Sequence, residues 1–584
     1  MEGSGGYQPR MSVPAFDCTR PFVLLDDVAA GTARLFAGLM ESVVAVAPEA
    51  VRPALDRLKA PGPWAGFVGF EAGYALEPVL PTRAPPAGEP LLWFGRFERE
   101  DGVDAAALLG HGATQLGAVQ PGLDVRDHAA QLARVQALIA AGDIYQANLT
   151  FNATVAVGGH PLHLYARLRA GARAPHGALV FTGSQWLLSF SPELFFRLEG
   201  RQLLARPMKG TAARGGDVAE DAARAAALQA DPKNRAENLM ITDLLRNDLS
   251  RVGHDVQVPA LFQVETYPSV LQMTSTITAT ARPGVTAADV LAQLFPCGSV
   301  TGAPKIRSLQ VIAEVETAPR GAYTGSIGAI AANGDAVFNV AIRTLVMQPG
   351  ADTARLGLGS GIVADSDAPA EWAECLQKAA FLTRRPPPDL IETLRCENGL
   401  LPDRDRHLAR MAASAAFLGL AFDAGAARTV LAAATNGVTG RVRLLAAPSG
   451  ALAVQVAPLP PAPATPVRVA LAPLPVSPDD WRLRHKTSDR AFYDAARRAS
   501  GAYEVLFVRP DGLITEGSFT NVFVERDGVL HTPPLALGLL PGVLRERLLD
   551  EGRAVEHALT VDDLRDGFFI GNALRGLIPA RRAF

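Results

Sequence analysis

Two short polar segments each place an ionisable group directly after an apolar stretch that is typical of a β-strand. Ser191-Pro192-Glu193 follows one such stretch, and Arg206-Pro207-Met208-Lys209-Gly210-Thr211 follows another. Chemistry is common at strand ends, so Glu193 and Lys209 are candidate site residues. Either segment alone is more simply explained as a solvated loop, because loops are normally polar.

Carboxylates on two predicted helices form a second candidate group. Glu237 begins the predicted helix Glu237–Leu249, and Glu371 and Glu374 lie three residues apart on one face of another helix. Magnesium prefers oxygen ligands and tolerates retained water, so carboxylates from two helices could hold it. Two solvated helix faces would give the same spacing, and this alternative stays open.

Two glycine-rich runs are candidates for binding an anionic group. The run Phe295–Lys305, which contains Thr301, is a glycine- and hydroxyl-rich turn that leads into a helix, where backbone amides suit an anion. The run Gly357–Gly361, which contains Ser360, is similar. As a nucleotide-binding fingerprint it is weak, because no strand–loop–helix unit with a downstream acid surrounds it.

The C-terminal third carries a further series of short segments, most of which contain a candidate site residue. They are Ile391–Arg395, Asp405–Met411 with Arg410, His485–Arg490 with Lys486, Thr515–Phe523 with Glu516, Leu540–Arg545 with Val543 and Leu544, and Phe569–Ala573 with Asn572. Singly, each has an ordinary explanation, since a lysine among polar residues is usually solvent-exposed and Gly542 before a helix is often a cap.

The elements that would position these residues are mixed in type. Apolar residues at helical spacing predict a helix over residues 127–141, which Gly142 ends. Three short runs predict strands, namely Ala178–Thr182, Leu187–Phe190 and Val337–Ile342.

Prolines divide the chain. Arg384-Arg385-Pro386-Pro387-Pro388 cannot continue a helix and favours an extended spacer. We therefore expect one domain over residues 1–384, a linker at 385–388 and a second domain over 389–584. A second proline-rich stretch, Pro458–Pro466, is interpreted as a loop between two lobes of the second domain.

Composition limits the class of protein. The chain has 584 residues, which is more than one core usually serves, with 48% hydrophobic and 20% charged residues. A formal net charge of -3 gives no basic excess to hold nucleic acid or an anionic membrane. The four cysteines form no CxxC pair, and no apolar run reaches bilayer length. We expect no signal peptide, because the first residues lack a basic segment followed by an apolar run. We therefore expect a cytoplasmic protein.

The segments before the prolines together resemble the chorismate-utilising family of anthranilate, aminodeoxychorismate and isochorismate synthase large subunits, over about residues 10–384. Besides those above, the resemblance rests on Gly142–Leu149, Tyr323–Gly328, Asn339–Thr344 and Gly359–Glu374. It implies an α+β fold, a two-sheet sandwich with surrounding helices.

The resemblance also implies roles for single residues. Glu237 and Glu374 match ligands of a magnesium ion that holds the ring carboxylate of chorismate. Glu193 matches the acid that protonates the departing ring hydroxyl, which is useful because hydroxide leaves poorly. The positions that match substrate contacts are Arg343, Lys378, Ser360, Gly361 and Thr301.

Lys209 distinguishes the members of this family. Anthranilate synthases carry alanine here, whereas aminodeoxychorismate synthases carry a lysine proposed as a nucleophile on the ring carbon. Leu271-Gln272-Met273 lacks the histidine that many members have, which fits a domain that stops at aminodeoxychorismate. The family normally receives ammonia from a separate glutamine amidotransferase subunit, and we expect such a partner.

The segments after the prolines resemble fold-type IV pyridoxal-phosphate enzymes, which include branched-chain and D-amino acid aminotransferases and aminodeoxychorismate lyase. The resemblance covers about residues 389–584 and implies two α/β lobes and a homodimer. Lys486 matches the Schiff-base lysine for pyridoxal 5'-phosphate, and Glu516 matches the acid at its ring nitrogen. The phosphate-binding positions are Arg410, the amides of Val543 and Leu544, and Asn572. The usual extra N-terminal strand with its Tyr-Gly-Asp-Gly segment is missing.

Three hypotheses follow. Lys209 implies the product that a lyase would consume, which favours a bifunctional enzyme making 4-aminobenzoate from chorismate. Alternatively, the second domain is an amino acid aminotransferase, since fold does not fix function. In a third hypothesis the chain is a non-catalytic scaffold for the amidotransferase, which the retained lysines and glutamates argue against.

Overall fold

The computed structural model describes residues 16–267 and 270–583, which form two compact units. The first unit comprises the described residues up to Thr211 together with Leu228–Glu265 and Gln272–Pro386. The second comprises Ala212–Ala227, the described residues between Thr266 and Leu271, and the chain from Pro387 onward. Both mix helices and strands, which confirms the α+β class.

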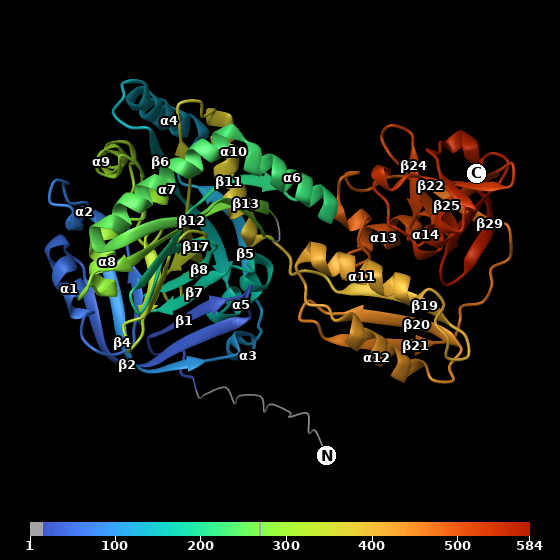
Figure 1. Cartoon of the computed structure of the whole chain (residues 1–584), viewed down its shortest axis with the longest axis horizontal. Coiled ribbons are helices and arrows are strands. Elements are labelled where there is room, and N and C mark those ends of the chain that lie inside the picture. The colour runs from blue at the N-terminus through green and yellow to red at the C-terminus, as the bar shows by residue number, and fades with distance from the viewer. Residues whose placement is uncertain (1–15, 268–269, 584) are drawn as a thin grey trace, which may run out of the picture. The chain divides into compact units, whose positions relative to one another are not determined.

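Eighteen strands of the first unit join in one hydrogen-bonded network (Figure 1). They are β1 (Phe22–Asp27), β2 (Thr32–Ala45), β3 (Trp64–Val68), β4 (Leu92–Gly102), β5 (Gln115–Pro121), β6 (Gln146–Gly158), β7 (His176–Phe181), β8 (Trp186–Ser191), β9 (Leu194–Glu199), β10 (Gln202–Arg206), β11 (Met208–Ala213), β12 (Gly253–Thr266), β13 (Val270–Ala281), β14 (Gly302–Ala303), β15 (Ser326–Ile330), β16 (Ala336–Asn339), β17 (Thr344–Met347) and β18 (Thr353–Ile362).

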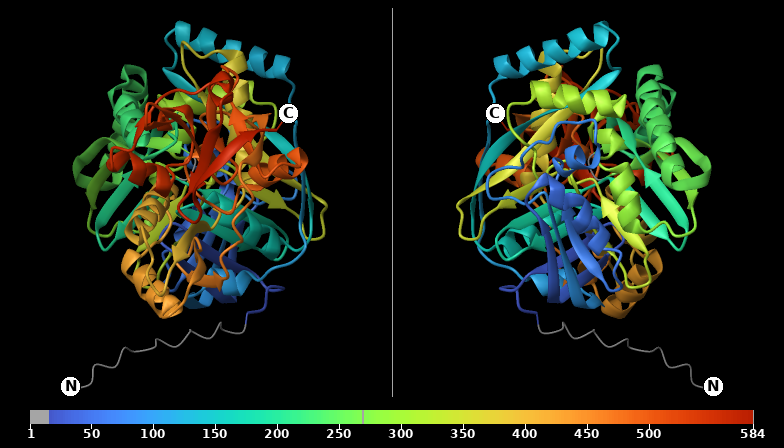
Figure 2. Two further views of the ribbon diagram at one scale, coloured as in Figure 1. Left: turned by 90° about the vertical axis from the view of Figure 1, so that its right-hand side faces the viewer. Right: turned by 90° about the vertical axis from the view of Figure 1, so that its left-hand side faces the viewer.

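Helices cover the outside of this network. They are α1 (Val51–Arg57), α2 (Ala72–Leu76), α3 (Ala105–Leu109), α4 (Val125–Ala140), α5 (Pro161–Ala172), α7 (Pro232–Val252), α8 (Ala287–Leu294), α9 (Lys305–Val315) and α10 (Ala368–Gln377), while α6 (Val218–Ala230) runs from the second unit into the first. Helix α4 packs on α9 and α10 and lies at the periphery in every view (Figures 1 and 2).

Antiparallel pairing brings distant strands together. Strand β18 pairs along its whole length with β6, and β17 joins β18 to β8. Strand β16 pairs with β9, which places the segment after β16 beside the end of β8. The candidate residues of the first unit therefore gather from strands that are far apart in sequence.

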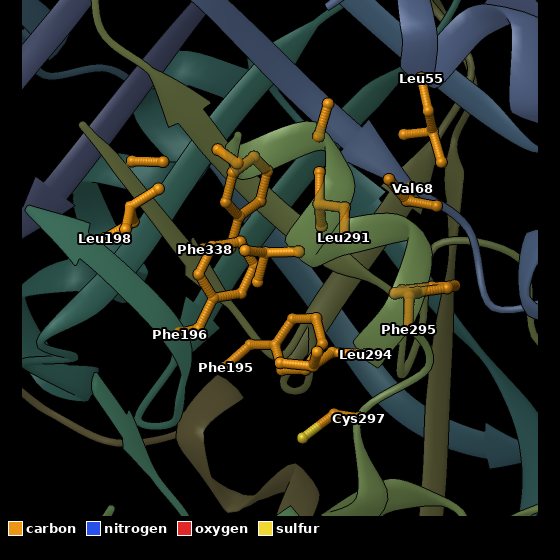
Figure 3. Close-up of a cluster of buried hydrophobic side chains, with 14 of the residues drawn as sticks. Leu55, Val68, Phe195, Phe196, Leu198, Leu291, Leu294, Phe295, Cys297 and Phe338 are labelled. Atoms are coloured by element: carbon orange, nitrogen blue, oxygen red, sulfur yellow. The ribbon is translucent and has the colours of Figure 1, made fainter. Parts of the chain in front are cut away.

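The cores explain why the network folds into layers. One core takes its side chains almost entirely from strands, including Val23, Phe67 and Leu187, so strand layers face each other across it, as expected for a sandwich. A second core, drawn in Figure 3, lies beneath α1, α7 and α8. There the rings of Phe196 and Phe338 stack with centroids 5.2 Å apart.

The second unit has two lobes, as the resemblance to fold-type IV enzymes implied. Its elements are β19 (Leu390–Cys396), α11 (Arg404–Leu418), α12 (Ala424–Thr435), β20 (Gly440–Ala446), β21 (Leu452–Ala457), β22 (Val467–Pro473), α13 (Ala491–Ser500), β23 (Glu504–Val508), β24 (Ile514–Gly517), β25 (Asn521–Arg526), β26 (Val529–Thr532), α14 (Val543–Asp550), β27 (Ala554–Glu556), β28 (Phe568–Asn572) and β29 (Gly576–Arg582). Strands β19–β21 form one antiparallel sheet and β22–β29 form a mixed sheet.

Most element predictions are confirmed. The predicted helix over 127–141 is α4, the predicted helix Glu237–Leu249 lies within α7, and Pro458–Pro466 is the connection between β21 and β22. The prediction of a glycine-rich turn at Gly357–Gly361 is wrong, because these residues form the last part of strand β18. A Cβ at Gly357 would lie 2.0 Å from the Tyr323 ring, so glycine here allows close packing and not a turn.

No helix in the described part of the chain is long and apolar enough to cross a membrane.

We expect Phe338→Ala to destabilise the first unit. Phe338 is fully buried between Phe94 and Phe196, so truncation leaves a cavity and lowers the free energy of unfolding by about 3–5 kcal/mol. Chemical denaturation monitored by circular dichroism measures the change. Val46→Ala is the control, because Val46 is 70% exposed and its truncation should cost less than about 0.5 kcal/mol. Equal effects of the two substitutions would contradict this account of the core.

Candidate active sites

The amine of Lys209 lies against a glycine of a neighbouring strand. Lys209 is on β11, and an ideal Cβ built on Gly361 of β18 would lie 3.2 Å from Lys209 Nζ. The same Cβ would lie 2.3 Å from Gln146 Nε2 on β6. Gly361 therefore keeps open the space in which the Lys209 and Gln146 side chains meet. Lys209 follows strand β10, as predicted, and itself lies near the start of the next strand, β11.

The charges around Lys209 favour a neutral amine. Desolvation lowers the pKa of Lys209, and the nearby ammonium of Lys378 lowers it further. Three carboxylates, Glu237, Glu193 and Glu374, act in the opposite direction without reversing the shift. The same interactions identify these four residues as the electrostatic surroundings of Lys209, so the structure gathers five of the predicted site residues.

Glu193 is a buried carboxyl group at the end of β8. Burial raises its pKa to about 7, against a hydrogen bond with Ser299 and the charges of Lys209 and Lys378. Its backbone is fixed on both sides, because Glu193 N donates to Ser191 Oγ at 3.2 Å and Val340 N donates to Glu193 O at 3.0 Å. Glu193 Oε1 has no hydrogen-bond partner among the described residues. The group can therefore hold a proton near neutral pH and give it up.

The two predicted metal ligands differ in their surroundings. Glu237, on α7, is partly buried, and desolvation raises its pKa with help from the charges of Asp365 and Glu371. Glu374, on α10, pairs with Lys378 at 2.8 Å, and this ammonium holds the pKa of Glu374 below its usual range. Within the described residues no three acidic, histidine or cysteine side chains form a group that could hold a metal ion unaided.

The predicted substrate contacts lie on the strands and turns around Lys209. Lys378 Nζ donates to Gly359 O at 2.8 Å, which ties the end of α10 to the glycine run of β18. Ser360 is fully buried and lies opposite Leu149 in the pairing with β6. Arg343 lies between β16 and β17 with a left-handed φ of 52°.

Thr301 has a structural contact that its predicted role did not anticipate. It is fully buried, and its hydroxyl donates to the carbonyls of Cys297 and Gly298 at 3.2 Å. Its own carbonyl accepts from Asn148 N at 2.7 Å. The side chain of Thr301 therefore holds the turn together.

Two glutamines complete the surroundings of Lys209, and sequence reasoning assigned no role to either of them. Gln146 is 1% exposed, and its Oε1 has no hydrogen-bond partner among the described residues. Gln272, which lies in the segment without the expected histidine, donates to Gly210 O at 2.8 Å and accepts from Thr211 Oγ1 at 2.9 Å. Gln272 thus anchors the strand just after Lys209. Only the motif around Gln146 could have signalled its importance.

The second unit contains a cavity of about 280 Å³ with Lys486 in its wall. Desolvation lowers the pKa of Lys486 to about 7, and the guanidinium groups of Arg490 and Arg410 contribute. The position of Lys486 is fixed through its backbone, because Ile391 N donates to Lys486 O at 3.0 Å. A substantial fraction of this amine is therefore neutral at neutral pH.

Glu516 lines the same cavity and is held by a tyrosine. Tyr493 Oη donates to Glu516 Oε1 at 2.5 Å, and burial raises the pKa of Glu516 to about 7. Tyr493 comes from α13, a helix to which the sequence assigned no site residue. This orienting contact could not be predicted, because the two residues are 23 positions apart on different elements.

Arg410 lines the cavity, and its guanidinium group is held by hydrogen bonds to residues that do not line the cavity. Its guanidinium donates to both carboxylate oxygens of Glu392 at 2.8 and 2.6 Å, and to Pro541 O at 2.9 Å. His407 Nδ1 lies 2.6 Å from Glu392 Oε2, and the Arg410 charge is the main interaction that holds the pKa of Glu392 at about 2. Glu392 lies in the candidate segment Ile391–Arg395, but the sequence does not indicate that it orients Arg410.

Two of the three remaining predicted phosphate contacts line this cavity. Val543, the first residue of α14, and Asn572 both line it, and Leu544 follows inside the helix. Asn572 Oδ1 accepts from the backbone of Arg575 at 2.9 Å, and its Nδ2 donates to Phe519 O at 3.2 Å. The amide side chain therefore shapes the turn at the cavity wall.

Comparison with known proteins finds two family matches along the chain. Residues 21–384 match the model of the chorismate binding enzyme family. The chain belongs to this family. Residues 389–583 match the model of amino-transferase class IV, a fold that implies pyridoxal 5'-phosphate. The chain therefore combines two enzyme families, as the sequence resemblances indicated.

The most similar relatives include two kinds of enzyme. A stretch of 247 residues is 41% identical to aminodeoxychorismate synthase component 1 of Klebsiella aerogenes and covers 42% of this chain and 54% of that protein. A stretch of 257 residues is 40% identical to anthranilate synthase component 1 of Streptomyces coelicolor, covering 43% and 50%. The matched stretches span about half the length of these relatives. Identity alone does not distinguish the two activities.

A solved structure supports the fold of the first unit. Anthranilate synthase component I of Streptococcus pneumoniae aligns with a TM-score of 0.54 at 25% identity, covering 66% of this chain and 95% of that chain. The chorismate binding unit therefore has the family's fold, and its activity has to be argued from the site.

We expect Gly361→Ala to inactivate the chorismate binding unit while leaving it folded. The added methyl group would displace the Gln146 and Lys209 side chains, and a misplacement of this size lowers rates by about tenfold to a hundredfold. Turnover with chorismate, ammonium and magnesium measures the effect. Gly102→Ala is the matched control, because a Cβ there meets nothing within 4 Å. Full activity of Gly361→Ala would refute the placement of Lys209.

We expect the ligand-free chain to take up pyridoxal 5'-phosphate at a rate that rises with pH and levels off above about pH 7. Only the neutral amine of Lys486 reacts, and its pKa is lowered to about 7 from the usual 10.5. Stopped-flow absorbance measures the rate, with Nα-acetyl-lysine as the reference amine. A rate that keeps rising to pH 9, as for the reference, would mean that Lys486 is not desolvated.

Proposed function

We propose that the first unit aminates chorismate to 4-amino-4-deoxychorismate and that the second unit eliminates pyruvate from this product to give 4-aminobenzoate. The observation that carries the proposal is the amine of Lys209 beside Gly361, with its pKa lowered and Glu193 nearby. A lysine nucleophile at this position is what the resemblance assigns to aminodeoxychorismate synthases and not to anthranilate synthases.

In the first unit Lys209 and Glu193 have complementary roles. Neutral Lys209 adds to the conjugated ring, and the ring hydroxyl leaves as water with the proton of Glu193. Ammonia then adds to the ring and releases Lys209 as a free amine, so the net change replaces hydroxyl by amine. Because Glu193 has a pKa near 7, it can be protonated at the start and lose the proton in the same cycle.

Magnesium fits the carboxylates beside Lys209. Glu237 has a raised pKa because it is desolvated near Asp365 and Glu371, and a divalent cation would relieve this repulsion. Magnesium commonly takes one or two protein carboxylates and completes its shell with water and substrate oxygens. Glu237 and Glu374 would hold it, and the ring carboxylate of chorismate would be its substrate ligand.

The second unit fits pyridoxal 5'-phosphate, which supplies an electron sink when bound. Lys486 would hold the cofactor, and Glu516, oriented by Tyr493, would face its ring nitrogen. Arg410, Asn572 and the amides of Val543 and Leu544 would surround its phosphate. The neutral Lys486 amine would be placed to take the proton from the nitrogen-bearing ring carbon. Returning that proton to the departing enolpyruvyl group would release pyruvate and leave an aromatic ring.

Ammonia has to be supplied from outside the two candidate active sites. The name component 1, carried by the Klebsiella relative, fits a partnership with a glutamine amidotransferase subunit. We propose that such a subunit supplies ammonia to the first unit, and that the second unit dimerises as fold-type IV enzymes typically do.

We expect the chain with chorismate, ammonium, magnesium and pyridoxal 5'-phosphate to make 4-aminobenzoate, and Lys486→Ala to accumulate 4-amino-4-deoxychorismate. Liquid chromatography with mass detection separates these products. Lys209→Ala is the companion variant and should stop the sequence before the aminated intermediate.

Other products would contradict the proposal in distinct ways. Anthranilate or isochorismate from the intact chain would refute the role of Lys209. Arrest of the intact chain at the aminated intermediate would refute the lyase assignment. Amino-group transfer from an added amino acid to 2-oxoglutarate would then favour an aminotransferase.

A further inference from the structure

The cavity of the second unit is strongly cationic. Besides Lys486, six arginines line it, namely Arg410, Arg441, Arg482, Arg490, Arg497 and Arg575, whereas Glu516 is its only acidic lining residue in the described chain. A cofactor phosphate would offset about two of these positive charges. Any lining arginine that has no acidic partner of its own points to an anionic substrate, because burying an unpaired charge is unfavourable.

Four of the six arginines already have fixed partners. Arg410 binds Glu392, Arg482 pairs with Asp480 at 2.7 Å, Arg497 donates to Asp494 at 3.4 Å, and Arg490 donates to Ser518 O at 2.5 Å. These contacts orient or neutralise their guanidinium groups. Arg441 and Arg575 are the two that remain.

Arg441 has no ion pair or side-chain hydrogen bond within the described residues, and Arg575 donates only to Pro461 O, at 3.1 Å. Both side chains are half-buried. The planar guanidinium group binds a carboxylate through two parallel hydrogen bonds, and such charge-assisted bonds are the strong ones. Each of these two arginines can therefore bind one carboxylate of a ligand by donating hydrogen bonds to it.

The backbone brings the two arginines to one side of the cavity. Arg441 on β20 lies directly opposite Arg395 on β19. Arg395 Nη1 donates to Leu574 O at 3.3 Å, which ties the turn carrying Arg575 to the same strand. Arg395 is already paired with Glu397 at 2.6 Å, so of these two opposed arginines Arg441 is the one left to bind an anionic ligand.

We infer that Arg441 and Arg575 form a carboxylate-binding wall that selects a substrate with two carboxylates for the second unit. This inference rests on the proposed function, because 4-amino-4-deoxychorismate carries a ring carboxylate and an enolpyruvyl carboxylate. Common amino acids with one carboxylate would leave one guanidinium unpaired. Arg441 and Arg575 are thus specificity-determining residues, separate from Lys486 and Glu516.

The first test is kinetic and uses the full chain loaded with pyridoxal 5'-phosphate. With 4-amino-4-deoxychorismate added directly, we expect Arg441→Gln to raise the KM for pyruvate release about tenfold and to leave kcat within about threefold. Arg443→Gln is the matched control, because Arg443 lies two residues further along β20, is exposed and is not part of the cavity wall. Its KM should not change.

The second test does not depend on the reaction. We expect isophthalate, a dicarboxylate, to bind the loaded chain at least about tenfold more tightly than benzoate, as measured by the cofactor absorbance. Arg441→Gln should remove this preference, while Arg443→Gln should keep it. If the intact chain prefers isophthalate but does not process the intermediate, the lyase assignment fails and the inference stands.

Two outcomes would overturn the inference. Equal binding of isophthalate and benzoate by the intact chain would mean that Arg441 and Arg575 do not recognise two carboxylates. A weaker affinity of Arg441→Gln for pyridoxal 5'-phosphate, with an unchanged KM, would mean that Arg441 serves the cofactor phosphate.

Discussion

Desolvation of a lysine amine is the interaction on which both sites depend. An ammonium group in water has a pKa near 10.5, and an amine that attacks carbon or removes a proton has to be neutral. In each unit the protein removes water from one lysine and places another cation nearby, which is Lys378 for Lys209 and Arg490 for Lys486. The two units have different folds but solve the same electrostatic problem.

Close backbone packing makes this desolvation achievable. In the first unit the glycines of β18 let neighbouring groups approach closely, with the Tyr323 ring at Gly357 and the Lys209 amine at Gly361. In the second unit Gly542 allows Asn521 to reach the start of α14, where a Cβ would lie 1.8 Å from Asn521 Oδ1. Larger residues would push these elements apart and admit water. The glycines therefore help to desolvate the two lysines, because they let the surrounding elements pack closely and exclude water.

The sequence predicted the elements better than the contacts that orient the candidate site residues. Periodicity predicted the helices that are α4 and α7, and ordered motifs indicated Lys209, Glu193 and Lys486 as candidates. The glycine run of β18 was mistaken for a turn, because glycine composition alone does not distinguish a turn from a tightly packed strand. Glu392, Tyr493 and Gln146 gained roles only from the fold, since each contacts a residue on another element.

The pKa shifts also tie function to stability through proton linkage. Glu193 has a pKa of about 7 in the folded chain and 4.5 as a model group, so between these values the folded state binds more protons, and its contribution to stability falls as the pH rises. Lys486 has a pKa of about 7 when folded and 10.5 as a model group, so there the unfolded state binds more protons, and stability rises with pH. The two contributions are therefore least favourable together near pH 7, where both groups are closest to their reactive forms. Neither shift helps the chain to fold at that pH, so the extensive cores of the two units must supply the stability that these groups cost.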